Sequence, residues 1–295
     1  MMVKQGLFVG LATLDLIYLT QGPPQANQKI VAQDTTFAAG GPATNAAVTF
    51  AYLGGQAQLL TALGSHPMAN LIRADLDQWS VEIVDLTPEY TQSPPVSSII
   101  VTATTGERAV VSLNAQRIQA NCDRCPAQIL HDIDIVLIDG HQMAMGAAIA
   151  QQAQAQGIPV VLDGGSWKPG LETVLPFVDY AICSADFYPP GCQTKEAVVA
   201  YLRAVRPSGH STPSPPQIAI TQGHEPILFF SGSGQGKVEV PQIQPIDTLG
   251  AGDIFHGAFC AFILQSDFAQ ALSQAGQIAA QACQSFGTRH WLTKT

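Results

Sequence analysis

The sequence predicts an α/β protein with three layers, in which a mostly parallel central sheet lies between two layers of helices and carries a small β lid. Two observations support this prediction. Short apolar runs alternate with segments of helical periodicity along most of the 295 residues. Runs such as Ile135–Ile138 are apolar at every position, which is typical of a strand buried on both faces. A chain of this length can fill one large domain, and we expect a single domain over residues 1–295.

Six strands and four helices are expected in alternation. The strands are Gly6–Leu11, Gln58–Ala62, Asp134–Ile138, Pro159–Leu162, Tyr180–Cys183 and Gln217–Thr221. The helices are Ala43–Leu53, Ala69–Trp79, Ala144–Gln156 and Lys195–Arg206. Pro42 suits the first turn of the first helix, and the Gly54-Gly55 pair ends it.

Two regions, residues 16–38 and 95–114, interrupt this alternation because both look extended and contain no helical segment. In the second region, Ser97–Thr102 and Ala109–Leu113 are rich in β-forming residues and are joined by a short loop that contains Gly106. Strands of this hairpin type do not simply join a parallel sheet. We therefore expect a small separate β-element that forms a lid over a site, with an ordinary edge hairpin as the alternative.

The composition argues against several classes of partner. A formal net charge of -9 and a pI of about 5.1 disfavour nucleic acid and anionic membranes as main partners. No apolar run is long enough to cross a bilayer, and Asp15 interrupts the apolar N-terminal stretch, so a secretory signal is not expected. Cys122 and Cys125 form a single CxxC without a second ligand pair, which disfavours structural zinc. We expect a protein with reduced cysteines in the cytoplasm.

The most informative stretch is Asp247–Asp253, which runs into an apolar segment of helical spacing. The small residues Gly250, Ala251 and Gly252 allow a tight turn whose N–H groups can approach an anion. The start of a helix also offers unpaired N–H donors and a positive dipole end, which suit phosphate. Asp253 would then place a carboxylate beside the anion, where it can accept a proton from an attacking hydroxyl. The alternative is that Asp253 only caps the helix.

A second group of residues suits a polyol. Asp15 follows the first strand, at the carboxyl end where ligands of open α/β sheets bind. Gly40 and Gly41 would let a ligand approach the backbone, and Asn45 adds a donor and an acceptor. A turn-forming aspartate and a helix-facing asparagine are the alternatives.

These two segments carry a resemblance to a known family. Asp247–Asp253 matches every fixed position of Asp-Thr-x-Gly-Ala-Gly-Asp, and so resembles the C-terminal signature of the ribokinase-like (PfkB) carbohydrate kinases. The segment 40–64 resembles the N-terminal signature of the same family, so the resemblance covers essentially the whole chain. Gly10–Tyr18, Gly106–Arg108 and Asp253–Ala258 look most similar to ketohexokinase-like and sulfofructose kinase-like members.

The resemblance implies roles for individual residues. Asp253 would be the catalytic base, and the N–H groups at Gly250, Ala251 and Gly252 would hold the transferring γ-phosphoryl group. The residues implied to bind the sugar are Asp15, Gly41, Asn45 and Asp139. The residues implied to contact ATP are Arg108, Thr221, Gly223 and Gly252.

The expected cofactors are ATP and Mg²⁺, with a monovalent cation as an option. Many family members hold Mg²⁺ and phosphate with an Asn-x-x-Glu motif, but this chain reads Cys-Ser-Ala-Asp-Phe-Tyr at residues 183–188. Both motif positions are therefore replaced. Asp186 is the candidate to take over part of that role through water.

The expected function is ATP-dependent phosphorylation of a hydroxyl group of a small sugar, a ketose or ketose derivative. A neutral acceptor is favoured because Lys29, Arg108 and Lys168 are the few cations that could bind an anionic one. A nucleoside kinase of the same fold is one alternative, with Phe37 and Tyr18 as the residues that could stack on a base. A sugar-binding regulator without turnover is the other. The resemblance also suggests a homodimer that forms through the lid.

Overall fold

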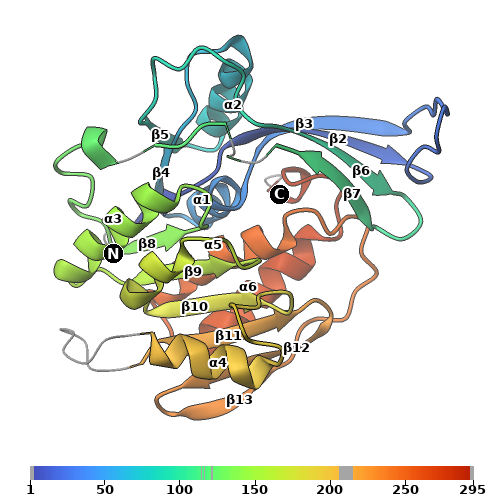
Figure 1. The fold of residues 1–295 in the computed structure, drawn as a ribbon. Coiled ribbons are helices and arrows are strands. Elements are labelled where there is room, and N and C mark those ends of the chain that lie inside the picture. The colour runs from blue at the N-terminus through green and yellow to red at the C-terminus, as the bar shows by residue number, and fades with distance from the viewer. Residues whose placement is uncertain (1–2, 114, 116, 121, 206–214, 293–295) are drawn as a thin grey trace.

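The computed structural model describes residues 3–113, 115, 117–120, 122–205 and 215–292 (Figure 1). Nine strands form the central sheet: β1 (Gln5–Val9), β4 (Gln56–Thr61), β5 (Val81–Asp85), β8 (Ile135–Ile138), β9 (Val160–Gly164), β10 (Tyr180–Ser184), β11 (Gln217–Gln222), β12 (Glu225–Ser231) and β13 (Gly234–Val238). Their order is β13-β12-β11-β10-β9-β8-β1-β4-β5. The strands from β11 to β5 run parallel, whereas β12 and β13 pair antiparallel at one edge.

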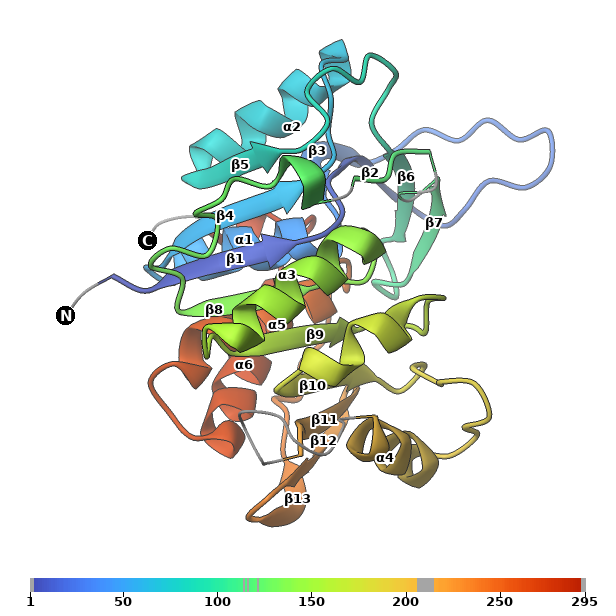
Figure 2. The same cartoon turned by 60° about the vertical axis from the view of Figure 1, so that its left-hand side comes forward.

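Helices cover both faces of this sheet (Figure 2). One face carries α1 (Pro42–Tyr52), α2 (Pro67–Gln78), α5 (Ala251–Ile263) and α6 (Phe268–Ala282), and the other carries α3 (Met143–Ala155) and α4 (Lys195–Ala204). Strand side chains alternate between the two cores, as β1 illustrates: Phe8 packs with the first helix group, and Leu7 and Val9 pack with the second. Burial on both faces explains why these strands are apolar at nearly every position.

The predicted fold class, with a parallel sheet between helical layers, is confirmed. Each expected strand and helix of the central layers is present, with ends shifted by a few residues. Arg206, at the end of one expected helix, lies outside the described residues. The sequence analysis did not anticipate β5, β12, β13 or α6, nor the short 3-10 turns Cys122–Arg124, Leu171–Thr173, Leu175–Phe177 and His290–Leu292.

A second sheet of four strands lies beside the central one (Figure 1). It consists of β2 (Thr13–Thr20), β3 (Asp34–Gly40), β6 (Val96–Thr102) and β7 (Arg108–Ser112) in the order β3-β2-β6-β7. We call it the lid sheet. Its strands come from the two regions that interrupt the βα alternation; Asn114, the last residue of the second region, lies outside the described residues. The lid sheet is more than two hairpins, because β2 and β6 pair parallel across a long connection.

The register of the lid sheet separates its two faces. Ile17 pairs with Thr36 and Ile99, and packs toward Leu249 and Phe286 of the body. Because side chains alternate along a strand, Asp15 lies on the same face as Ile17. The neighbouring row, which contains Leu16, Phe37 and Val111, lies on the opposite face.

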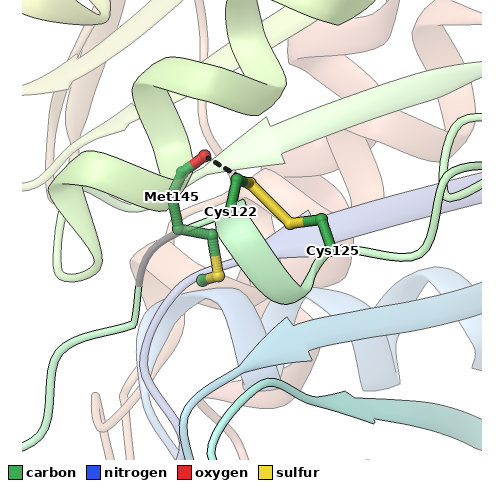
Figure 3. The surroundings of a disulfide bond; sticks show 3 residues. All are labelled: Cys122, Cys125 and Met145. Carbon is green, nitrogen blue, oxygen red and sulfur yellow. Dashed lines mark hydrogen bonds between the residues drawn. A yellow bond between two sulfur atoms is a disulfide. The ribbon is translucent and has the colours of Figure 1, made fainter.

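One expectation about the cysteines is wrong. Cys122 and Cys125 are joined by a disulfide rather than reduced (Figure 3). The 3-10 turn over Cys122–Arg124 brings the two Cα atoms to 4.8 Å, within the range that a disulfide needs. The Cys122 sulfur lies 3.8 Å from the carbonyl oxygen of Met145 on α3.

Within the described part of the chain, none of the helices combines the length and apolar character that a membrane span requires.

Candidate active site

The turn that begins α5 depends on glycine. Gly250 precedes the helix with φ of 70°, a left-handed conformation that side chains rarely adopt, and a Cβ there would lie 3.0 Å from Thr288 Cγ2. Asp247 shapes the approach to this turn, since its two carboxylate oxygens accept bonds from the N–H groups of Leu249 and Gly287, each at 2.8 Å. A Cβ on Gly252 would meet open space, so backbone is exposed here.

Asp253 lies in the first turn of α5 and points toward α1. Its Oδ2 accepts a hydrogen bond from Asn45 Nδ2 at 2.8 Å. Burial, with a smaller contribution from the negative charge of Asp163, raises the pKa of Asp253 from 3.8 to about 7. A carboxylate whose pKa lies near neutrality is suited to accept a proton and release it again.

Asp15 on β2 is the second carboxylate of the site. It is buried, and its Oδ1 has no hydrogen-bond partner among the described residues. Burial raises the pKa of Asp15 to about 6. The hydrogen bond from Ser97 and the positive charge of Arg289 lower this pKa, but by less than burial raises it. A buried oxygen without a partner is costly, so it indicates a place where a ligand hydroxyl can donate.

Small residues at the end of β3 make room for Asp15. A Cβ on Gly40 would lie 2.0 Å from Asp15 Oδ2, so only glycine fits beside the carboxylate. Gly41 follows with φ of 103° and leads into α1. The helix then places Asn45, whose N–H bonds to the Gly41 carbonyl at 2.9 Å, between the Gly40-Gly41 turn and Asp253. Asp15, Gly41, Asn45 and Asp253 thus come together from three different segments.

Asp139 has a structural role that the sequence did not indicate. Its carboxylate accepts bonds from the backbone N–H groups of Leu11 at 2.8 Å, Ala43 at 3.2 Å and His141 at 2.8 Å. It therefore ties the end of β8 to the loop after β1 and to the start of α1. A sugar contact for Asp139 stays a prediction.

A cavity of about 540 Å³ lies against the start of α5. The residues predicted to contact ATP, together with Ala251, all line it: Arg108, Thr221, Gly223, Ala251 and Gly252. Its far end is largely apolar and includes Val240, Ile243, Ala279 and Ala280. Arg108 reaches across from the lid sheet and donates through Nη1 to Thr248 Oγ1 at 3.1 Å.

A magnesium site cannot be built from protein side chains alone in the described residues, where no group of three His, Cys, Asp or Glu is placed to hold a metal ion. Asp186 is exposed, and Phe187 beside it is buried in the core. Mg²⁺ in kinases is commonly bound by one or two carboxylates and the substrate phosphates. Asp186, as an exposed carboxylate, stays the candidate for such a contact through water.

Four residues near Asp253 were missed by the sequence analysis: Asp75, Asp163, His256 and Arg289. Asp163 ends β9 and lies 3.4 Å from Nδ1 of the buried His256, which also faces the Gly252 carbonyl at 2.6 Å. Asp163 could have been found, because it follows a strand as Asp15 does. Arg289 lies in the C-terminal segment, and no local pattern marks it.

Comparison with known proteins defines the class. Residues 4–295 match the family model of the pfkB family carbohydrate kinases, so the chain belongs to this family. It is an ATP-dependent kinase with an alcohol group as acceptor.

The chain is similar to individual proteins of known name, and the solved structures among them share its fold. The ribokinase of Bacillus subtilis (strain 168) is 24% identical over 292 residues, which cover 95% of this chain and 93% of that protein. The structure of Arabidopsis thaliana ribokinase complexed with ribose and ATP superposes with a TM-score of 0.75 at 20% identity, and the match covers 100% of both chains. The adenosine kinase of Schistosoma mansoni in complex with 2-fluoroadenosine has a TM-score of 0.79 at 14% identity, with 96% of each chain covered.

Proposed function

We propose that this protein transfers the γ-phosphoryl group of ATP to a hydroxyl of a small neutral sugar, a ketose or ketose derivative, with Asp253 as general base. One arrangement of contacts carries the proposal. Asp253 follows Gly252, which lines the cavity together with Arg108, and it accepts a hydrogen bond from Asn45 on α1, the helix that follows the Gly40-Gly41 turn beside the buried carboxylate of Asp15. A nucleotide and an acceptor on these two sides would meet at this carboxylate.

The backbone around Asp253 suits a transferring phosphoryl group. The N–H groups of Gly252 and Asp253 belong to the first turn of α5, where helical geometry provides no intrahelical acceptor. The N–H of Ala251 instead donates to the Thr248 carbonyl at 3.3 Å, so Ala251 contributes mainly by its small size. Arg108 adds a positive charge on the ATP side. Phosphoryl transfer depends mainly on such positioning and charge neutralisation.

Mg²⁺ is the proposed cofactor, carried into the site with ATP, and Asp186 is the proposed protein contact, through water. The ion would neutralise charge on the phosphates. The proposed task of Asp253 is to take the proton of the acceptor hydroxyl, a step that is worth roughly 10² to 10⁴ in rate.

The charges around the acceptor side favour a neutral sugar. Asp15 is negative when ionised, and the nearest cation, Arg289, already donates to Asn45, Ala39 and Asp75. Lys29 is exposed on the loop between β2 and β3. An anionic acceptor would therefore be repelled by Asp15 and Asp253, and neither Arg289 nor Lys29 is placed to offset this repulsion.

The nucleoside kinase alternative is weakened by the register of the lid sheet. Phe37 pairs with Leu16, and Tyr18 lies two residues further along β2, so both aromatic rings are on the face opposite Asp15. They cannot stack on a base that is held by Asp15. Asp253 argues against the regulator alternative, because a protein that only binds sugar does not need a carboxylate with a pKa near 7.

The experiment is an ADP-release assay with MgATP and a panel of acceptors that contains D-fructose, D-tagatose, D-ribose, their phosphates and adenosine. We expect turnover with a neutral sugar, and a loss of at least a hundredfold in Asp253→Asn with little change in sugar binding. Turnover by Asp253→Asn at the wild-type rate would exclude the base assignment. Turnover with adenosine alone would select the nucleoside kinase, and sugar binding without ADP release would select the regulator.

A further inference from the structure

The guanidinium of Arg289 is held at several points close to the site. Its side chain is only 12% exposed. Nε lies 3.2 Å from Asp75 Oδ2, Nη1 donates to Asn45 Oδ1 at 2.9 Å, and Nη2 donates to the Ala39 carbonyl at 2.6 Å. Arg289, in the C-terminal segment, therefore contacts both α2 and α1, and Asn45 on α1 contacts Asp253.

The contact with Asn45 determines what Asn45 can offer to Asp253. A guanidinium has only donors, so the carboxamide must present its oxygen to Arg289 and its nitrogen to Asp253. In this orientation Asn45 can only donate to Asp253, which favours the ionised carboxylate. Without Arg289 the carboxamide is able to turn over and accept a hydrogen bond from protonated Asp253, which would stabilise the form that cannot act as a base.

The contact with Ala39 connects the same arginine to the lid sheet. Ala39 is the last residue but one of β3, next to Gly40. Its carbonyl accepts from Arg289 and its N–H donates to Asp75 Oδ2 at 3.0 Å, so the ion pair bonds both backbone polar groups of this one residue. The position of the strand end beside Asp15 and the orientation of Asn45 are set by one side chain.

We propose that Arg289 is a positioning residue for the catalytic base: it orients the Asn45 carboxamide as a donor to Asp253 and fixes the end of β3 in the same arrangement. The proposal rests on the proposed role of Asp253 as general base. Arg289 itself does not reach the acceptor, because its guanidinium donates to Asp75, Asn45, Thr288 and Ala39.

The other charges that face Asp253 come from three elements. Asp163 at the end of β9 raises the pKa of Asp253, and it does so in addition to burial. His256 on α5 and Arg108 on β7 lower it, together with the hydrogen bond from Asn45. The hydrogen bond from Asn45 lowers the pKa of Asp253, whereas burial and Asp163 raise it. Without this hydrogen bond, the pKa of Asp253 should therefore rise.

The test measures the protonation of Asp253 directly in the full chain without ligand. Aspartate labelled with ¹³C at the carboxyl carbon is followed by NMR from pH 5 to pH 9, and the Asp253 signal is assigned by its loss in Asp253→Asn. In Arg289→Met we expect the midpoint to move upward by about one pH unit. Asn45→Ala should move it in the same direction. The double variant should move it by less than the sum of the two, because Arg289 acts partly through Asn45.

A matched control is Arg73→Met, which removes another arginine that bonds an aspartate and a carbonyl, Asp85 and Gly64, away from Asp253. It should leave the midpoint unchanged. An Arg289→Met midpoint that moves no further than this control, or strictly additive shifts, would overturn the proposal. If Arg289→Met does not fold, Arg289→Lys replaces it: a lysine keeps the charge but has no planar fork to hold Asn45 and Ala39 together, and an unmoved midpoint counts against the proposal in the same way.

Two further readouts separate the parts of the proposal. Amide exchange over Asp34–Gly40 should quicken in Arg289→Met and stay near wild type in Asn45→Ala. With the sugar identified by the acceptor panel, the rising limb of kcat/KM for the sugar against pH should shift with the NMR midpoint, because both report the free enzyme, while KM for MgATP is unchanged. Wild-type turnover in Asp253→Asn would refute the proposed function, whereas an unmoved NMR midpoint would refute only the role of Arg289.

Discussion

Replacing the base should stabilise the protein at alkaline pH while it removes activity. The pKa of Asp253 is raised in the folded state from 3.8 to about 7, chiefly by burial. A raised folded-state pKa means that the contribution of this group to stability is fully present below pH 3.8 and is lost as the pH rises through 7. Asparagine cannot ionise, so Asp253→Asn should not show this loss.

The size of the effect follows from the two pKa values. A pKa difference of about 3 units corresponds to about 4 kcal/mol at pH 8, using roughly 1.4 kcal/mol per unit. At pH 5 the wild type has lost less than half of this contribution. Between pH 5 and pH 8, the free energy of unfolding of the wild type should therefore fall by about 2–3 kcal/mol relative to that of Asp253→Asn.

The measurement is urea unfolding of both proteins at pH 5 and pH 8 without ligands. Asp77→Asn on α2 serves as the control, because Asp77 is exposed and its replacement removes one negative charge outside the site. The control should follow the wild type at both pH values. If the free energy of unfolding of Asp253→Asn changes with pH as that of the wild type does, ionisation of Asp253 does not destabilise the folded protein. That result would refute the claim that burial raises the pKa of this carboxylate.

Three other perturbations test separate parts of the structure. Gly250→Ala should lower the free energy of unfolding by roughly 1–2 kcal/mol in a denaturant titration, because it forces a side chain into a left-handed conformation against Thr288; an unchanged midpoint would contradict that conformation. Arg108→Ala should raise KM for ATP more than KM for the sugar in steady-state assays, and an effect confined to the sugar would place this arginine in the other subsite. We also expect a homodimer through the lid sheet, since Phe37 and Val111 are 58% and 77% exposed on one face. Phe37→Asp with Val111→Asp should give a monomer by light scattering, and a monomeric wild type would exclude this interface.

Local sequence patterns were sufficient for the six inner strands of the central sheet, from β11 to β4, and for the turn at α5. Strands such as β8 and β9 are buried on both faces, so burial alone dictates their composition and makes them recognisable. Gly250 needs glycine for its backbone conformation, and that requirement is visible in the sequence as a small residue at a fixed distance before Asp253. In both cases the structural constraint acts on the residue itself or on its immediate neighbours.

The parallel pairing of β2 with β6 could not be predicted in the same way. Two helices and two strands of the central sheet lie between β2 and β6 in the sequence, and each of the two strands reads locally as part of a hairpin. Their register decides which side chains of β6 share a face with Asp15, and it places Ser97 directly beside it. The disulfide between Cys122 and Cys125 was missed for another reason, because the sequence fixes the spacing of the two cysteines but not the 3-10 turn that brings them together.

The polar groups behind the base show why spatial convergence limits prediction from sequence. Arg289 and Asn45 are 244 positions apart, and Asn45 and Asp253 are 208 apart. Asn45 was singled out for the hydroxyl groups that it could bind, yet its two amide atoms are both used inside the protein, one by Arg289 and one by Asp253. The Asn45 oxygen accepts from Arg289, so its nitrogen donates to Asp253. Burial favours the neutral form of the Asp253 carboxyl group, whereas this hydrogen bond favours the ionised form. In the proposed mechanism the acceptor hydroxyl approaches this same carboxylate, and we expect its proton affinity to depend on Arg289, which does not touch the substrate.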